Sequence, residues 1–212
     1  VGNAKCWTFT TQYNGWYALR FDNDGNDAGT EYQIKVEQQK ISSSTCTAKL
    51  STTKYTYNGS KKTPKVVVKN ASGKTLNEDV DYTVTYPSSR KNVGKYKVVI
   101  KFKGSYTGTK NLYFTINPAK TSVKKLSSGK KSLTVAITKK STQTTGYEVQ
   151  YSTSKKFKSA KVKKIKSYKT TSLTLKSLKA KKTYYVRVRT FKKVDGKTYY
   201  SSWSSEKKKK TK

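Results

Sequence analysis

The sequence predicts an all-β protein made of tandem β-sandwiches, preceded by a short or truncated β-module. Apolar and polar residues alternate through most of the chain, which is the period of a half-buried strand. Turn signals such as Asn58-Gly59 and Asp195-Gly196 separate these stretches, and no stretch has a convincing helical period. The 17 Tyr and 3 Trp favour strands and can fill packed cores.

The distribution of charge divides the chain into three segments. The formal net charge is +36, and it is −1 over residues 1–45, +11 over residues 46–118 and +26 over residues 119–212. Such breaks in composition predict boundaries near residues 45 and 118. The 212 residues therefore hold a partial β-module followed by two small domains.

The first segment carries the stretch WTFTTQYNGWYALRFDNDGNDAGTEYQIKVEQ. It resembles the last three strands of a surface Ig-like or jelly-roll module, in which a strand, an NG-type turn, a strand and a DxxG turn precede a final strand. Forty-five residues are few for a complete sandwich. We therefore expect a truncated module or a set of strands that completes the sheet of the next segment.

Of the two cysteines, Cys6 stands near the start of this segment and Cys46 directly after its end. One even pair without metal-type spacing favours a disulfide in an extracellular chain. The alternative is two unpaired buried thiols.

Two further groups in the first segment could bind ligands. Asp22, Asp24 and Asp27 surround Gly25 in an oxygen-rich loop that could bind Ca²⁺, but the EF-hand spacing is absent. A polar hairpin turn with Asx-type hydrogen bonds is the alternative for that loop. The aromatic residues Trp7, Trp16 and Tyr17 could form a platform for sugar rings, and core packing would explain the same residues.

In the second segment, alternation places Tyr96, Val98, Ile100 and Phe102 on one face of a strand, and lysines with Val99 on the other. Tyr57-Asn58-Gly59, Pro64, Asp81-Tyr82 and the loop GSYTG at 104–108 add turns and strand ends. Residues 55–118 resemble the Ig-like repeat, often labelled MBG-like, of secreted and surface proteins of Gram-positive anaerobes. The resemblance implies an Ig-like domain over 46–118, in which Tyr106 closes one end of the sandwich between Gly104 and Gly108.

A short linker, Ala119–Ser122, follows Asn117-Pro118 and leads to the third segment. There, GYEVQYSTSKKFKSAK at 146–161 has the pattern of a strand and its following turn. Leu178, Ala180, Lys182 and Tyr184 have the spacing of a tyrosine corner, with Ala and Lys in place of the usual Pro and Thr. Residues 119–212 thus resemble a Lys-rich bacterial fibronectin type III domain, with SSWS at 201–204 on its last strand.

The stretch TYYVRVRTFKKVDGKTYYSSWS at 183–204 interleaves aromatic and basic residues. Alternation assigns Tyr184 to the buried face and Arg187 and Arg189 to the outer face of one strand. We predict that Trp203 returns beside these arginines and stacks on one of them as a cation–π pair on the exterior of the sandwich.

Catalytic chemistry finds little support in the composition. The chain has no His, which excludes Ser–His, Cys–His and His-ligated metal sites, and its 11 acidic residues stand mostly in turns. We predict a non-catalytic protein that requires no cofactor or metal, apart from the Ca²⁺ considered above. The chain also lacks an apolar run near the length of a membrane span.

The lysines favour a diffuse electrostatic interaction. A chain with 43 Lys and 4 Arg lacks the Arg forks that read nucleic-acid bases, so we expect no specific nucleic-acid partner. Lys207, Lys208, Lys209 and Lys210 form a basic tail that, with the lysine-coated strands, can bind anionic polymers. The alternative is a solvated surface that blocks pairing between strand edges.

Together these features predict an extracellular, secreted or cell-surface region that acts as a spacer and as an adhesion or anchoring module. It would connect to upstream domains of the same polypeptide, and its cationic domain would associate with an anionic cell-envelope polymer or glycan. The alternative function is a carbohydrate-recognition module attached to a secreted glycan-degrading enzyme.

Overall fold

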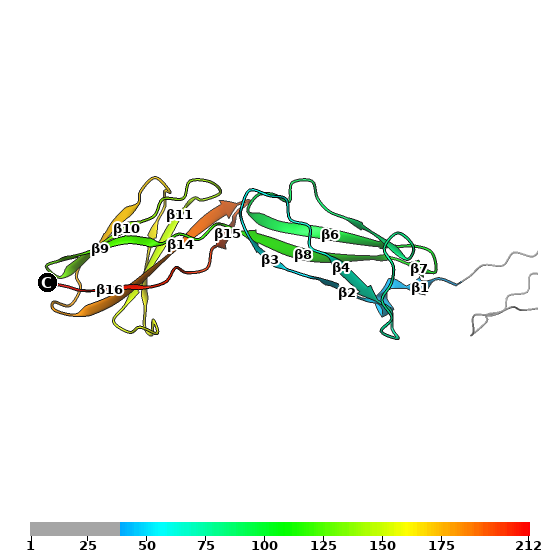
Figure 1. Ribbon diagram of the computed structural model, residues 1–212, viewed down its shortest axis with the longest axis horizontal. Coiled ribbons are helices and arrows are strands. Elements are labelled where there is room, and N and C mark those ends of the chain that lie inside the picture. The colour runs from blue at the N-terminus through cyan, green and yellow to red at the C-terminus, as the bar shows by residue number, and fades with distance from the viewer. Residues whose placement is uncertain (1–38) are drawn as a thin grey trace, which may run out of the picture. The chain divides into compact units, whose positions relative to one another are not determined.

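A computed structural model describes residues 39–212, and these form two β-sandwiches connected by a short linker (Figure 1). The prediction of an all-β chain of tandem sandwiches is confirmed. Within the described residues the one helical element is a single 3-10 turn, η1, at Ser43–Thr45.

The first sandwich packs a two-stranded sheet against a four-stranded sheet of order β3-β8-β6-β5. Its strands are β1 (Ile41–Ser42), β2 (Thr47–Leu50), β3 (Lys54–Thr56), β4 (Val66–Lys69), β5 (Tyr82–Thr85), β6 (Gly94–Phe102), β7 (Tyr106–Thr107) and β8 (Thr109–Asn117). The two-stranded sheet is β2-β4, and β1 pairs separately with β7 in parallel. The pair β3–β8 is parallel as well, whereas β6 is antiparallel to both β5 and β8.

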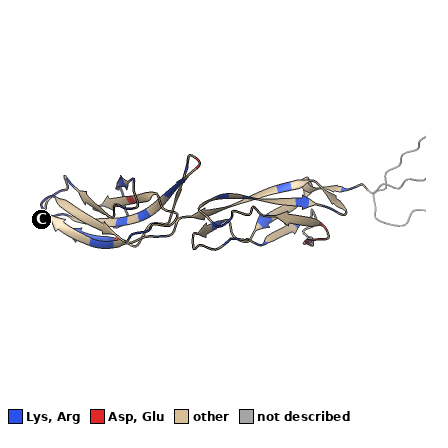
Figure 2. Ribbon diagram, turned by 90° about the horizontal axis from the view of Figure 1, so that it is seen from above, with Lys and Arg blue, Asp and Glu red and all other residues tan. Residues whose placement is uncertain are grey.

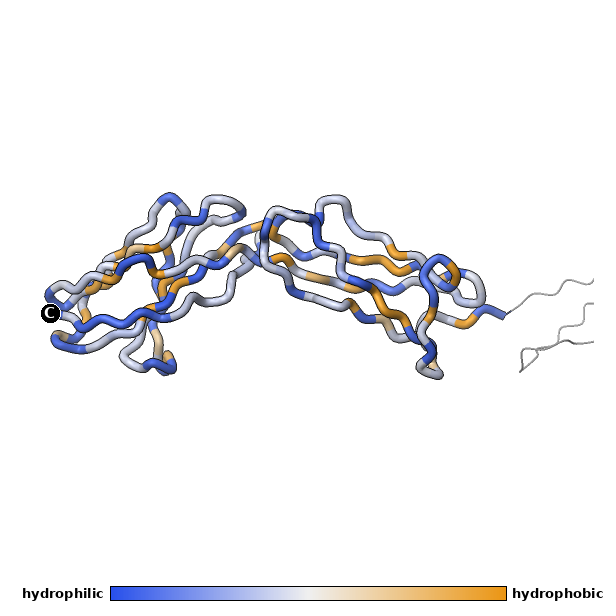
Figure 3. The backbone as a smooth tube through the Cα atoms, in the orientation of Figure 1, coloured by the Kyte–Doolittle hydropathy of each residue, from blue (hydrophilic) through white to orange (hydrophobic). Residues whose placement is uncertain are grey.

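Alternation along the strands builds the core of this sandwich. On β6 the side chains of Val98, Ile100 and Phe102 are buried, while the lysines on the opposite face of the strand are exposed, as the sequence predicts. The hydropathy colouring of Figure 3 shows the same interchange of apolar and polar residues along the strands. Burial of such side chains contributes about 1.5–3 kcal/mol each, which makes this face the main source of stability.

The first sandwich begins before residue 46, the start expected from composition. Ile41 and Ser42 pair with Tyr106 and Thr107, and Ser43 is buried in the turn that follows. Cys46 is 2% exposed and belongs to the core of this sandwich. The composition break reflects the acidic residues of the first segment, the last of which is Glu37, whereas the β-pairing starts at Ile41.

The loop before β8 closes one end of the sandwich. Tyr106 is buried against Phe102, with ring centroids 6.3 Å apart. Gly108 has φ +106°, and a Cβ there would lie 2.4 Å from Oγ of Ser43. Only glycine fits this backbone and this close approach, so the expected role of the GSYTG loop is confirmed.

The second sandwich packs a three-stranded sheet of order β13-β10-β9 against a larger sheet of order β12-β11-β14-β15, in which β16 also pairs with β14. Its strands are β9 (Val123–Gly129), β10 (Ser132–Ile137), β11 (Gly146–Ser152), β12 (Lys161–Ile165), β13 (Ser172–Leu175), β14 (Thr183–Val194), β15 (Lys197–Tyr200) and β16 (Lys207–Lys210). The strand β8 ends at Asn117 and β9 begins at Val123, so residues 118–122 connect the last strand of the first sandwich to the first strand of the second.

The second core is built from inward residues of β10, β11 and β14, among them Val135, Val149 and Val188, each 0% exposed. The tyrosine corner forms despite its changed sequence. The hydroxyl of Tyr184 accepts a hydrogen bond from the backbone N–H of Lys179 at 3.1 Å, and Leu178 is buried. The hydroxyl of Thr211 donates to the carbonyl of Lys179 and accepts from the N–H of Lys182, so it supports the corner in which Ala and Lys replace Pro and Thr.

Candidate functional site

The outer face of the β12-β11-β14-β15 sheet gathers charged and aromatic side chains. Antiparallel register sets Glu148 opposite Arg189 and Gln150 opposite Arg187, and the residues between these positions point into the core. Residues directly opposite each other share a face, so the four polar side chains lie together on the exterior. Burial follows this assignment: Tyr184, Val186 and Val188 are buried, and both arginines are partly exposed.

Arginines and aromatic rings on this face form a continuous stack, which we name the cation–aromatic ladder. The guanidinium of Arg187 lies 4.0 Å from the ring centroid of Phe157 and 5.1 Å from that of Trp203. The guanidinium of Arg189 lies 4.3 Å from Trp203 and 4.0 Å from Tyr200. Trp203 therefore joins the two arginines, and each contact contributes about 0.5–1 kcal/mol where it is exposed and more where it is desolvated.

The ladder continues across the sheet through Lys164 of β12. Its ammonium lies 4.3 Å from the ring of Phe191 and 5.9 Å from that of Tyr200. The rings of Phe191 and Tyr200 are 6.3 Å apart, so the lysine stem covers an aromatic pair. The full ladder consists of Phe157, Arg187, Trp203, Arg189, Tyr200, Lys164 and Phe191.

One carboxylate anchors the ladder. The side chain of Glu148 is 10% exposed, and its Oε2 accepts hydrogen bonds from Arg189 at 2.7 and 2.9 Å. Its Oε1 lies 3.9 Å from the ammonium of Lys164. Contact of two guanidinium nitrogens with one carboxylate restricts the orientation of Arg189 beside the rings of Trp203 and Tyr200.

Arg187 has a different environment. Its Nε donates to the amide oxygen of Gln150 at 2.6 Å. Burial lowers the pKa of Arg187 below its ordinary value, and the neighbouring Arg189 cation lowers it further, while Glu206 acts in the opposite direction.

Trp203 does not lie on a strand, and here the structure corrects the expectation that SSWS continues the last strand. Residues 201–206 are irregular and connect β15 to β16. The backbone N–H groups of Ser201 and Ser204 donate to the carbonyls of Thr190 and Val188, as in a strand pair. In the reverse direction the serine hydroxyls replace backbone carbonyls as acceptors: the N–H of Thr190 donates to Ser201 Oγ at 3.1 Å, and the N–H of Val188 donates to Ser204 Oγ at 3.0 Å. These hydroxyls hold the segment against β14 and leave Trp203 pointing at the arginines.

The four lysines at 207–210 form strand β16 and are not the tail that the sequence suggests. Lys207 and Lys209 lie opposite Val186 and Tyr184, on the core-facing side of the strand, and all four lysines are exposed because β16 stands at the sheet edge. Lys207 donates to the backbone carbonyl of Lys124 on β9 at 3.1 Å. Inward-pointing charges on an edge strand prevent pairing with another chain.

Basic residues are spread over both sandwiches, with the acidic ones confined to a few points (Figure 2). The second sandwich has Glu148, Asp195 and Glu206 against 29 basic residues. With Glu148 paired to Arg189, most of the cations on this sandwich have no carboxylate beside them. The described residues contain no cluster of three or more His, Cys, Asp or Glu that could hold a metal ion.

Several predicted site residues lie outside the described part of the chain. These are Cys6 of the proposed disulfide, the candidate calcium loop Asp22, Asp24 and Asp27, and the candidate sugar platform Trp7, Trp16 and Tyr17. In residues 39–212 no helix is both long and apolar enough to span a membrane.

Sequence reasoning missed Phe157, Tyr200, Lys164 and Phe191 as members of the ladder, and Glu148 as the carboxylate that anchors it. Glu148 could have been found, because it is a lone acid between the alternating core residues Tyr147 and Val149. Phe157 stands in a loop with φ +55°, and periodicity carries no signal for such a position.

The second sandwich matches a known protein family. Residues 117–207 match the family model described as the fibronectin type III domain. This part of the chain is a fibronectin type III domain. Fibronectin type III domains are typically extracellular and non-catalytic, and they commonly act as spacers or adhesion modules within multidomain proteins.

Two solved structures are similar to parts of this chain. One comprises the FN1-FN3 domains of chicken CNTN1, with 17% identity, a TM-score of 0.37, and coverage of 70% of this chain and 48% of that one. A second is a run of titin domains, with 14% identity, a TM-score of 0.33, and coverage of 78% of this chain and 66% of that one. The chain thus spans about half the length of the CNTN1 structure. No curated protein matches it.

Proposed function

We propose that this chain is a non-catalytic spacer and adhesion region of a secreted or cell-surface protein of a Gram-positive bacterium. Its fibronectin type III domain associates with an anionic polymer of the cell envelope. The Ig-like resemblance of residues 46–118 supports the setting, and the spacer role follows from the common use of both kinds of module.

The observation that carries the association is the excess of exposed cations on the second sandwich. Residues 119–212 have a net charge of +26, and β16 adds four consecutive exposed lysines along one edge. Attraction between such a surface and a polyanion releases counterions, so the affinity falls steeply as salt is added. A lysine coat that serves only to keep strand edges apart would show no preference among the polymers it meets.

Sedimentation of the full 212-residue chain with purified cell walls, over a range of salt concentrations, tests the proposal. We expect binding at low salt, and we expect substitution of Lys207, Lys208, Lys209 and Lys210 by Gln to weaken it. If all four lysines contact the polymer, the slope of log K against log salt becomes shallower by about 2–3, as for single-stranded polyanions.

A matched variant separates this interface from general charge. Lys61, Lys65, Lys69 and Lys74 are exposed on the first sandwich, and their substitution by Gln removes the same charge. Equal weakening by both variants would contradict an interface on the fibronectin type III domain, as would failure of the wild-type chain to sediment with walls at low salt.

A further inference from the structure

A second surface lies on the first sandwich, on the outer face of the sheet β3-β8-β6-β5. Lys95, Lys97 and Lys101 alternate along β6 with the core residues and are all exposed. Alternate residues on a strand are about 7 Å apart, so Lys95 and Lys97 present two cations at that spacing. The face therefore has a row of positive charge that the core does not require.

An exposed aromatic ring lies beside this row. Tyr113 of β8 is directly opposite Lys97 and is 46% exposed, which sets it apart from the buried or half-buried rings of this sandwich. The ammonium of Lys95 lies 4.4 Å from the centroid of the Tyr113 ring. The ring thus holds one cation in place and keeps part of its own surface open to a ligand.

The neighbours on the same face are hydroxyls and an amide. In register, Thr115 lies opposite Lys95, and Asn111 and Thr85 flank Val99. The three acidic residues of the described first sandwich, at positions 78, 79 and 81, stand in the loop before β5. The face accordingly offers cations, an aromatic ring and neutral hydrogen-bonding groups, without a carboxylate among them.

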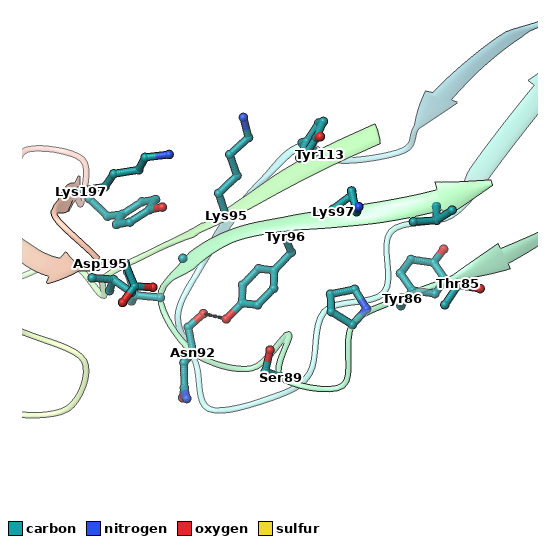
Figure 4. Close-up of a pocket in the computed structure, with 16 residues that line it drawn as sticks. Thr85, Tyr86, Ser89, Asn92, Lys95, Tyr96, Lys97, Tyr113, Asp195 and Lys197 are labelled. Carbon is teal, nitrogen blue, oxygen red and sulfur yellow. Dashed lines mark hydrogen bonds between the residues drawn. The ribbon is translucent and has the colours of Figure 1, made fainter. Parts of the chain in front are cut away.

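The surface is hollowed at this point. A cavity of about 880 Å³ is lined by Thr85, Lys95, Lys97 and Tyr113, and also by Lys197 and Tyr199 of the hairpin β14–β15. Figure 4 shows Lys95, Lys97 and Tyr113 along the strands that border the cavity, with Tyr96 hydrogen-bonded to the carbonyl of Asn92 beneath them. Asp195, at the turn of the hairpin, is the one carboxylate among the described lining residues.

We propose that this face of the first sandwich binds an anionic carbohydrate chain. The carboxylate or phosphate groups of the chain pair with Lys95 and Lys97, one sugar ring lies on Tyr113, and sugar hydroxyls bond to the threonines and Asn111. The proposal is independent of the interface proposed on the fibronectin type III domain, since no residue of β16 takes part.

A carbohydrate fits the face better than a nucleic acid does. A strand of nucleic acid is held by several successive aromatic rings and by arginine, whereas β6 and β8 present one exposed ring and only lysines. Sugar hydroxyls also need the neutral donors and acceptors that surround Tyr113.

Affinity electrophoresis of the full chain with polygalacturonate in the gel measures the proposed binding. Polyphosphate serves as an anion without sugar rings, neutral dextran as a sugar without charge, and oligo-dT as the nucleic-acid probe. We expect Tyr113→Ala to weaken polygalacturonate binding about fivefold to tenfold through loss of the ring contact, and to leave polyphosphate binding unchanged. Lys97→Gln weakens the binding of both polyanions.

Tyr185→Ala, which removes a partly exposed ring from the second sandwich, is the matched control and retains polygalacturonate binding. An unchanged affinity in Tyr113→Ala, an equal loss for polyphosphate in that variant, or tighter binding to oligo-dT than to polygalacturonate would overturn the proposal. If only the β16 lysine variant lost polygalacturonate binding, this inference would fail and the function proposed above would stand. If only Tyr113→Ala lost polygalacturonate binding, this inference would stand and the function proposed above would fail.

Discussion

Glu148→Gln tests whether the cation–aromatic ladder depends on its one carboxylate. The substitution keeps the size of the side chain and removes its charge, so Arg189 loses the anion that accepts its two hydrogen bonds at 2.7 and 2.9 Å. Three cations, those of Arg187, Arg189 and Lys164, then remain close together without a negative charge to balance them.

The expected cost lies between the values for buried and for surface ion pairs. Removing one partner of a buried pair costs about 3–5 kcal/mol, and an exposed pair contributes about 0–1 kcal/mol. Here the Glu148 side chain is 10% exposed and that of Arg189 is 26% exposed. We therefore expect the free energy of unfolding of the second sandwich to fall by about 2–3 kcal/mol.

Urea denaturation followed by the fluorescence of Trp203 measures this change. A background with Trp7→Phe and Trp16→Phe makes Trp203 the sole tryptophan, and it reports directly on the ladder. Glu206→Gln removes an exposed carboxylate from the same sandwich and should change stability by no more than about 0.5 kcal/mol. Equal effects of the two substitutions would refute the role given to Glu148, and so would a coupling energy near zero between Glu148→Gln and Arg189→Gln.

Two further substitutions test the packing of the second sandwich. Gly146→Ala places a Cβ 2.1 Å from the carbonyl oxygen of Ile165 and should destabilise this sandwich by about 3 kcal/mol or more. The urea midpoint should therefore fall, and a midpoint equal to that of the wild type would contradict the close approach. Tyr184→Phe removes the acceptor of the Lys179 N–H and should cost about 1 kcal/mol in the same assay, and no measurable loss would mean that the tyrosine corner contributes nothing.

Alternation in the sequence predicts which face each residue of β6 and β14 occupies, because successive side chains of a strand point to opposite sides. The same reasoning places Arg187, Arg189 and Trp203 on one exterior, and the structure brings these three side chains together. It assigns SSWS to a strand wrongly, since serine hydroxyls replace the backbone carbonyls as acceptors there. Side-chain hydrogen bonding of this kind leaves no periodic signal.

The edge strand β16 shows a second limit of prediction from sequence. A run of four lysines has no apolar member, so no alternation distinguishes a strand from a solvated tail. Its pairing with β14 depends on a partner more than twenty residues away in the chain. Tyr113 is a similar case: its place in an alternating strand gives its face, but only the register across β6 shows that Lys95 and Lys97 surround it.

The parallel pairs of the first sandwich have a mechanical consequence. The strand β1 runs parallel to β7, and β3 runs parallel to β8. Both β1 and β3 lie near the start of the sandwich, and β8 leads out of it. A pulling force applied through the two ends of this sandwich therefore loads the hydrogen bonds between these strands in shear. Bonds loaded in shear share the tension and must break together, whereas those of a hairpin open one after another. A spacer under flow or traction would resist extension through the three residue pairs from Lys54↔Thr115 to Thr56↔Asn117.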